Sequence, residues 1–218
     1  MMQAEGAATP HGEASLREQL VGMIERLPDG SMPLGELLDR FGEDGLLLVT
    51  IFLTLVFLIP VSIPGVSTAF GAVILLVGVS RLRGKPLWLP ARLRARSIPT
   101  ARLRPALERG LGWVQRLEKV SRPHRLPGLA HGRAVELVND AAFILAALLL
   151  MAPFGFVPFS NTLPAIALLL FSVGFLQRDG GAVLLAHLAN VATIVYFGVL
   201  IGGGGLVMKE LFNRIGLG

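Results

Sequence analysis

Two short polar segments each follow a pair of prolines inside an otherwise apolar stretch. Ser67-Thr68 comes after Pro60 and Pro64, and Ser160-Asn161-Thr162 comes after Pro153 and Pro158. Side-chain oxygens at such positions can cap a helix by accepting N–H groups of its first turn. If the breaks lie inside a membrane, the same groups and the positive helix ends could instead bind an anionic or polar ligand. The candidate substrate-binding residues are therefore Ser67, Thr68, Ser160, Asn161 and Thr162.

A second polar group lies on the last apolar segment. His187, Asn190, Thr193 and Tyr196 recur every third residue. Ionisable groups inside a membrane indicate a functional site, whereas hydrogen bonding between helices is the alternative interpretation. Because threefold spacing drifts by about 60° per step on a helix, one site can include about two of the four. We take His187 and Asn190 as the further candidate substrate-binding residues.

The sequence carries no pattern typical of an enzyme. It has no Gly-rich phosphate loop followed by Lys, no Gly-x-Ser-x-Gly and no His-Glu-x-x-His. Without cysteine it has no thiol nucleophile and no thiolate metal ligand. We expect a protein that is not an enzyme, with no catalytic residue, no metal and no cofactor.

Composition indicates a membrane protein. Apolar residues make up 53% of the chain and the mean hydropathy is +0.65, concentrated in blocks. Two uncharged runs, Gly45 to Ser80 and Ala141 to Gln177, are each broken by a proline pair. Each arm of the first run is about 22 Å long as a helix, against roughly 30 Å of hydrocarbon. The arms therefore either span a thinned bilayer or enter it and return as re-entrant hairpins.

The two hairpins resemble one another. Sliding one onto the other by 94 positions superposes Pro64 on Pro158, Thr68 on Thr162 and Leu82 on Leu176. Duplicated, proline-broken apolar units predict a transporter-like inverted repeat with a binding site near the breaks. Chance similarity between two Leu/Val-rich stretches is the alternative.

The expected fold class is an all-α membrane protein with two repeated proline-broken hydrophobic hairpins, one C-terminal spanning helix and peripheral amphipathic helices. The spanning helix is expected from Gly181 to about Ile201, ended by the glycines at 202–205. Amphipathic helices are expected at Ala14 to Leu27 and at Pro33 to Phe41. The expected divisions are an N-terminal tail with these helices at 1–42, hairpins at 43–82 and 135–178, a connector at 83–134, and the final helix with its tail at 179–218.

The connector is strongly basic. From Arg81 to Arg133 there are fourteen Lys and Arg against two acids, a local net charge of +12. The positive-inside rule places such a connector in the cytoplasm. Because only Trp88 and Trp113 are interleaved with the charges, anionic lipid headgroups are favoured over nucleic acid. An amphipathic helix, kinked near Pro105, is expected from Leu103, Leu107, Leu111, Val114, Leu117 and Val120.

Two carboxylates flank the second hairpin. Asp140, one turn after Glu136, is interpreted as part of a solvated helix start, with a proton-coupling carboxylate as the alternative. Asp179 is expected in a turn at the water interface beside Arg178.

Several blocks resemble the ExoD exopolysaccharide-synthesis proteins. The blocks are Leu34 to Gly42, Ile63 to Thr68, Arg81 to Pro90, Pro158 to Ala165 and Leu176 to Gly180. The resemblance runs from about residue 15 to 201, and Gln177 departs from it where an acidic residue is expected. It implies a bacterial inner-membrane protein involved in surface polysaccharide production, without supplying a molecular activity.

Two functions are favoured by the sequence, and a membrane-embedded enzyme comes third. The first is transporter-like translocation of a small anion or a lipid-linked intermediate that supports exopolysaccharide synthesis. The alternative is a non-transporting scaffold that recruits polysaccharide-synthesis enzymes through the basic connector. The expected partners are anionic lipid headgroups, with a second copy of the chain and those enzymes as further candidates, and no nucleic acid.

Overall fold

The computed structural model describes residues 16–58, 65–101, 103–105, 107–108, 111–112, 126–129, 132–152 and 157–215, and most of them are helical. Pro60, Pro64 and Pro153 of the expected breaks lie outside these residues. The elements in chain order are α1 (Leu16–Glu25), β1 (Ser31–Pro33), α2 (Leu34–Leu55), η1 (Val56–Leu58), α3 (Val66–Arg83), α4 (Ala91–Arg94), β2 (Ser97–Pro99), η2 (Pro127–Leu129), α6 (Arg133–Leu150), α7 (Thr162–Gln177) and α8 (Gly180–Ile215).

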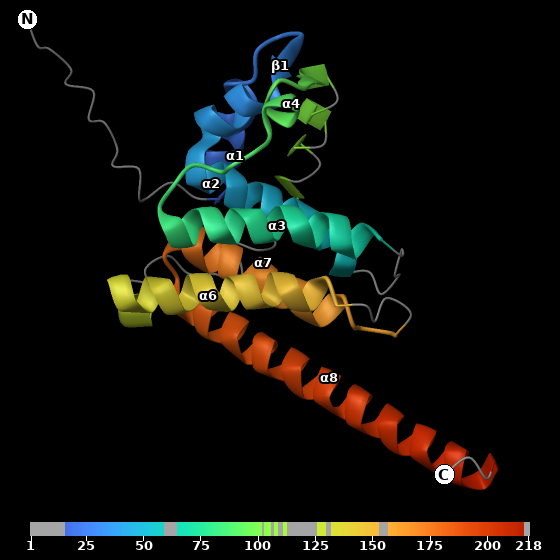
Figure 1. Ribbon diagram of the computed structural model, residues 1–218. Helices are drawn as coiled ribbons and strands as arrows, with labels where there is room; N and C mark the ends of the chain where they lie inside the picture. The colour runs from blue at the N-terminus through green and yellow to red at the C-terminus, as the bar shows by residue number, and fades with distance from the viewer. Residues whose placement is uncertain are drawn as a thin grey trace, which may run out of the picture.

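Four helices form the bundle, and each hairpin contributes two. α3 packs on α6 and α2 packs on α7, while α7 also contacts α6 and α8 (Figure 1). α7 is the central helix, and most of its residues are buried. α7 begins after the second break and ends before Arg178, as expected from the sequence. The residues between these two points are uncharged and can therefore all be buried.

Close packing of α3 on α6 depends on small residues. A Cβ added to Gly78 would lie 2.8 Å from Cγ1 of Ile144 and 2.9 Å from Cδ1 of Phe143, and one on Gly71 would meet Met151. Glycine at these positions lets the helix backbones approach, as is common between membrane helices. Phe143 is fully buried and has edge contact with Phe171 of α7.

The same contacts give the relative direction of the hairpins. Gly71 near the start of α3 faces Met151 just after α6, whereas Arg81 near the end of α3 meets Asp140 in the first half of α6. α3 and α6 are therefore antiparallel, and the residues that flank both breaks lie at one end of the bundle. We call this the break end and the opposite end the connector end. Because both hairpins start and finish at the connector end, the expectation of an inverted repeat is wrong; the two hairpins run in the same direction.

The N-terminal helices lie on the bundle. α1 confirms the amphipathic helix expected there, and its Leu20 and Ile24 join a buried cluster with Leu47 of α2. The second expected helix and the first hairpin arm form one helix, α2, with a kink at Gly42. Gly42 has φ 58° and ψ −151°, a conformation that essentially only glycine adopts.

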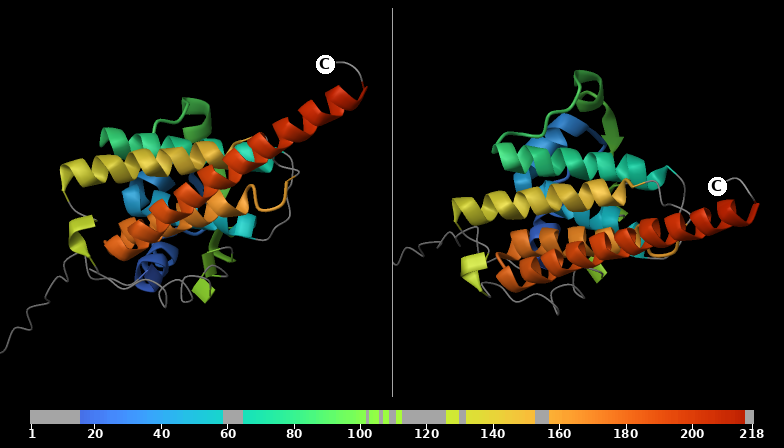
Figure 2. Two further views of the ribbon diagram at one scale, coloured as in Figure 1. Left: turned by 90° about the horizontal axis from the view of Figure 1, so that it is seen from below. Right: turned by 60° about the horizontal axis from the view of Figure 1, so that its bottom comes forward.

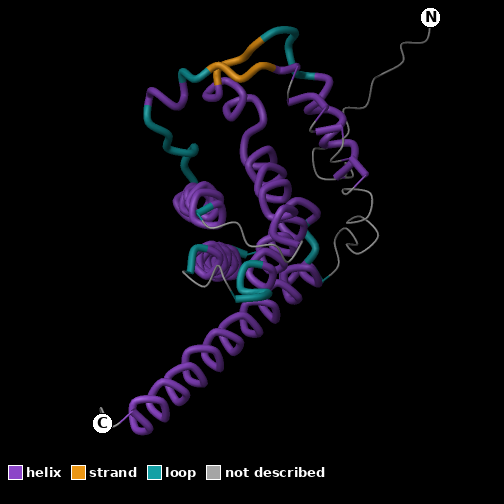
Figure 3. The backbone as a smooth tube through the Cα atoms, turned by 90° about the vertical axis from the view of Figure 1, so that its right-hand side faces the viewer, coloured by secondary structure: helices purple, strands orange, loops and turns teal. Residues whose placement is uncertain are grey.

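A small antiparallel sheet connects the N-terminal region to the connector. β1 pairs with β2, with Met32 opposite Ile98, and Thr100 donates through both N–H and Oγ1 to the carbonyl of Gly30. Neither strand was expected, because three-residue strands carry too little alternation to be recognised in a sequence. The sheet lies at the opposite extreme of the molecule from the free end of α8 (Figure 3).

The connector continues beyond the sheet along the bundle. Leu107 and Leu111 of the expected amphipathic helix pack against the buried cluster of α1, α2 and α7. At these two positions the apolar side therefore faces the protein rather than a membrane. Val114, Leu117 and Val120 lie outside the described residues.

α8 is longer than expected. It continues through the glycines at 202–205 to Ile215, so the expected helix end at this run is wrong. Glycine costs about 1 kcal/mol per residue in a helix but keeps its N–H donor, unlike proline, so helix formers on both sides can propagate through it. The second half of α8 projects beyond the other helices in every view (Figure 2).

Two described helices are long and apolar enough to cross a membrane, α3 and the segment Gly180–Gly204 of α8. Both are mostly unburied within the molecule. Many large apolar side chains of the helices are exposed, among them Leu137, Val138, Leu184, Leu188, Val191, Ile194, Val195 and Val199. An exposed apolar surface of this extent is typical of contact with lipid or with another protein.

Candidate functional site

The expected caps at the breaks are not formed. The N-cap of α3 is Gly65, in a left-handed conformation, and no side chain caps the helix. Ser67 and Thr68 instead lie in the first turn of α3, where Ser67 is buried and Thr68 exposed. Asn161 is the N-cap of α7 but its side chain makes no capping hydrogen bond, because its backbone is helical rather than extended. The capping interpretation of these residues is therefore wrong.

Asn161 is nevertheless a buried polar residue at the start of α7. It is 5% exposed, and within the part of the chain that the structure describes its Nδ2 has no hydrogen-bond partner. The adjacent Ser160 is 1% exposed and donates from Oγ to the carbonyl of Val157 at 2.8 Å. Phe159 before it has φ 63°, which is unusual for a bulky residue. An unpaired buried amide donor costs about 1–3 kcal/mol. A ligand that accepts a hydrogen bond from Asn161 would remove this cost.

His187 and Asn190 form hydrogen bonds to α6. His187 Nε2 lies 2.8 Å from Oδ1 of Asn139, whose Nδ2 donates to the carbonyl of Leu129 in η2. Asn190 Nδ2 donates to the carbonyl of Ala142 at 2.8 Å, while its Oδ1 is buried without a partner. These contacts support helix-to-helix hydrogen bonding for both residues. Asn139 was not singled out in the sequence, because a lone amide shows no partner until the helices are packed.

The structure does not bring the two groups of candidates together. Tyr196 Oη donates to the carbonyl of Pro158 at 2.6 Å, which places Pro158 beside the middle of α8. Asn190 lies six residues earlier on α8, about 9 Å along the helix axis. The residues Ser160, Asn161 and Thr162 therefore belong to the break end, and His187 with Asn190 belongs to the connector half of the bundle.

An unexpected charged cluster lies at the connector end. The guanidinium Nε of Arg81 donates to Oδ1 of Asp140 at 3.1 Å, and its Nη1 lies 3.6 Å from Oε2 of Glu43. The ring centroid of Phe175 is 4.4 Å from the Arg81 Cζ. Arg81 appears in the sequence only as one of fourteen basic residues, and no spacing rule relates it to an acid so far along the chain.

The carboxylates of Asp140 and Asp179 are both buried, whereas the sequence predicts both in contact with water. Asp140 is 7% exposed and paired, so the interpretation as a solvated helix start is wrong. Asp179 is 1% exposed, and its Oδ1 accepts the N–H of Gly181 in the first turn of α8. Its turn is present, with Arg178 at φ 51°, but the carboxylate is buried rather than at a water interface.

The polar pair His187 and Asn139 borders a cavity of about 320 Å³. The remainder of its lining is apolar, from η2 and the first turns of α6 and α8, including Leu129, Val138 and Leu184. Within the described part of the chain no group of three His, Asp or Glu residues could hold a metal ion.

Comparison with known proteins identifies a family. The family model described as "Exopolysaccharide synthesis, ExoD" matches residues 16–199. Protein ExoD of Rhizobium meliloti strain 1021 is 45% identical over 188 residues, covering 86% of this chain and 78% of that protein. An uncharacterized protein of Synechocystis sp. is 32% identical over 134 residues, 61% of each chain. No solved structure matches the chain.

Proposed function

Because the chain belongs to the ExoD family of exopolysaccharide-synthesis proteins, we propose that it acts in the bacterial inner membrane as a transporter-like protein. It translocates a small anion or a lipid-linked intermediate that polysaccharide synthesis requires. The proposal includes no catalytic step. Its binding site is at the break end, around the start of α7.

The observation that carries the proposal is the unpaired amide of Asn161. A buried donor with no partner among the described residues, at the positive end of a sixteen-residue helix, suits an anionic or polar group. Ser67 and Ser160, which are also buried near the two breaks, would supply further hydroxyl groups.

The position of Pro158 supports a site inside the bilayer. Its contact with Tyr196 lies about 24 Å along α8 from Gly180, against roughly 30 Å of hydrocarbon. The apolar segment of α8 continues to Gly204, about 12 Å further along the axis. If Gly180 lies at the membrane surface, Pro158 lies short of the other side, as expected for a residue of a re-entrant hairpin.

The packing of the hairpins supports a duplicated unit. Each first arm packs on the second arm of the other hairpin, α2 on α7 and α6 on α3. If the two hairpins were related by a two-fold axis, the contact of α2 with α7 would be equivalent to the contact of α6 with α3. A binding site between two such units is the usual arrangement in transporters built from repeats.

The experiment that tests the proposal is complementation with break-end variants. In a strain lacking its own copy of the gene, Asn161→Ala is expected to lose exopolysaccharide production while membrane-inserted protein stays at wild-type abundance. Ser172→Ala is the matched control on the same helix, because its buried hydroxyl donates to the carbonyl of Leu168 within α7. Normal polysaccharide production by Asn161→Ala would refute the site.

The scaffold remains the second candidate, supported by the exposed basic residues of the connector. Arg83, Lys85, Arg92 and Arg96 are exposed, and Trp88 is 73% exposed, which suits anionic headgroups or an acidic partner protein. A scaffold predicts that replacing Lys85, Arg92 and Arg96 with Gln abolishes polysaccharide production while Asn161→Ala leaves it normal. The transporter predicts the opposite pattern.

A further inference from the structure

A groove crosses one side of α2 and reaches the last turn of α3 at Ser80. Two adjoining hollows of about 610 Å³ and 290 Å³ lie on either side of Asp39, which lines both. The larger is formed with α4, and the smaller with the loop that follows α3. Ligand sites have volumes of about 300–1,000 Å³, so the groove has room for a small organic molecule or a short oligomer.

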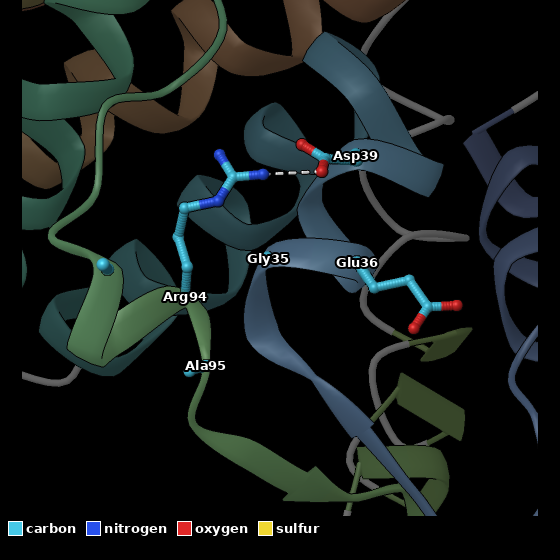
Figure 4. A pocket seen from close by; sticks show the side chains of 6 residues that line it. Gly35, Glu36, Asp39, Arg94 and Ala95 are labelled. Carbon is cyan, nitrogen blue, oxygen red and sulfur yellow. Dashed lines mark hydrogen bonds and ion pairs between the residues drawn. The ribbon is translucent and has the colours of Figure 1, made fainter.

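The wall formed by α4 is held closely against α2. A Cβ on Gly35 would lie 3.0 Å from Nε and 3.2 Å from Cβ of Arg94, so a side chain at this position would displace Arg94. Arg94 Nη2 donates to Oδ2 of Asp39 at 2.6 Å across the larger hollow (Figure 4). The N–H of Leu34 donates to the carbonyl of Arg96, next to the β1–β2 pairing. The groove is therefore preorganised by the backbone.

The wall formed by the loop after α3 is equally well defined. Gly84 ends α3 in a left-handed conformation, and the N–H of Lys85 donates to the carbonyl of Ser80. Ser80 Oγ donates in return to the carbonyl of Lys85 at 2.7 Å. These bonds hold the backbone of Lys85 at the edge of the smaller hollow.

The side chains that line the groove are of both charges and remain accessible. The carboxylates of Asp39 and Glu43 have side-chain exposures of 58% and 64%, although each has a basic partner. Arg94 and Lys85 supply donors on the facing wall. The lining holds three acids, Glu36, Asp39 and Glu43, against two bases, Arg94 and Lys85, so its net charge is only −1 and acceptors and donors are both present.

We propose that this groove binds a saccharide, the glycan part of an exopolysaccharide precursor. Each sugar hydroxyl both donates and accepts, so neighbouring carboxylates and cationic donors can bind it with charge-assisted hydrogen bonds. Trp88 is not one of the lining residues, but it follows Leu87 of the lining and is 73% exposed, so its fluorescence can report on binding nearby. The choice of ligand rests on the family's role in polysaccharide synthesis but not on translocation at the break end.

The test measures saccharide binding by the purified full-length protein in detergent. The substitution Trp113→Phe leaves Trp88 as the sole tryptophan. The probe is the mixture of oligosaccharides released by mild acid from the producing strain's exopolysaccharide. A saturable change in Trp88 fluorescence is expected, and saturation-transfer NMR measures binding independently of Trp88. Asp39→Asn and Arg94→Gln should each weaken binding about tenfold or more.

Arg92→Gln is the matched control, because Arg92 is exposed on the same short helix but does not line the groove. It should bind like the parent protein. The substituted residues are partly exposed, and an unchanged melting temperature verifies that each variant is folded. No saturable binding at millimolar oligosaccharide by either method, or equal weakening in all three variants, would overturn the proposal. Asn161→Ala should keep full saccharide binding, which separates this groove from the break-end site.

Discussion

Arg81 of α3 and Asp140 of α6 are 59 residues apart in the sequence, yet Arg81 Nε donates to Asp140 Oδ1 at 3.1 Å. The same guanidinium also contacts Glu43 of α2 and lies over the ring of Phe175 of α7. One side chain of α3 therefore touches the three other arms of the two hairpins at the connector end. The side chains of Arg81 and Asp140 are 17% and 10% exposed, so water screens this pair only weakly.

Breaking this ion pair should destabilise the bundle. Arg81→Ala leaves the buried carboxylate of Asp140 without Arg81, at an expected cost of about 3 kcal/mol. Asp140→Ala should cost less, because Arg81 keeps its contact with Glu43. The double substitution of Arg81→Met with Asp140→Leu removes both charges and should cost less than the sum of the single alanine variants. Thermal unfolding of the detergent-solubilised protein measures all three. Strictly additive losses would show that the pair is not coupled.

Adding one methyl group to α3 should also destabilise the bundle. In Gly78→Ala the new Cβ meets side-chain atoms of Ile144 and Phe143 of α6, so these side chains or the helix must shift, at an expected cost of about 1–3 kcal/mol. Gly198→Ala on α8 is the control, because a Cβ there meets nothing within 4 Å and alanine favours a helix. A melting temperature of Gly78→Ala equal to that of Gly198→Ala would contradict the observed packing.

The bond between His187 and Asn139 should be measurable as a coupling energy. His187→Ala leaves the Asn139 amide oxygen without its partner, at about 1–3 kcal/mol. Together with Asn139→Ala, a double-mutant cycle should give about 0.5–2 kcal/mol of interaction. Ile194→Ala, at an exposed position on the same helix, should leave stability unchanged. Absence of coupling would mean that the two side chains do not bond in the membrane.

The topology can be tested with fused reporters. If both hairpins return to their starting side and α8 crosses once, residues near Arg104 and the chain end at Gly218 lie on opposite sides of the membrane. A reporter active only in the cytoplasm should work after Arg104 and fail after Gly218, since the positive-inside rule predicts a cytoplasmic connector from its fourteen basic residues. The reverse result, or activity at both sites, would refute the topology.

The sequence alone predicts the helical arms well. The bounds of α7 coincide with its uncharged run, and α1 follows its apolar spacing closely. Hydropathy and periodicity are local properties of the sequence, so they predict where helices form independently of how the helices pack. The family could also be identified at this stage, because its blocks keep their order along the chain.

Only the tertiary structure decided how these arms are combined. The kink at Gly42, the β1–β2 pairing and the Arg81–Asp140 bond each depend on partners distant in sequence. The same holds for the candidate site residues. Asn161 and His187 are both polar residues on apolar segments, but Asn161 Nδ2 has no partner among the described residues, whereas His187 bonds to Asn139. Whether a buried polar atom is satisfied depends on the neighbouring helix, and neither composition nor spacing specifies that neighbour.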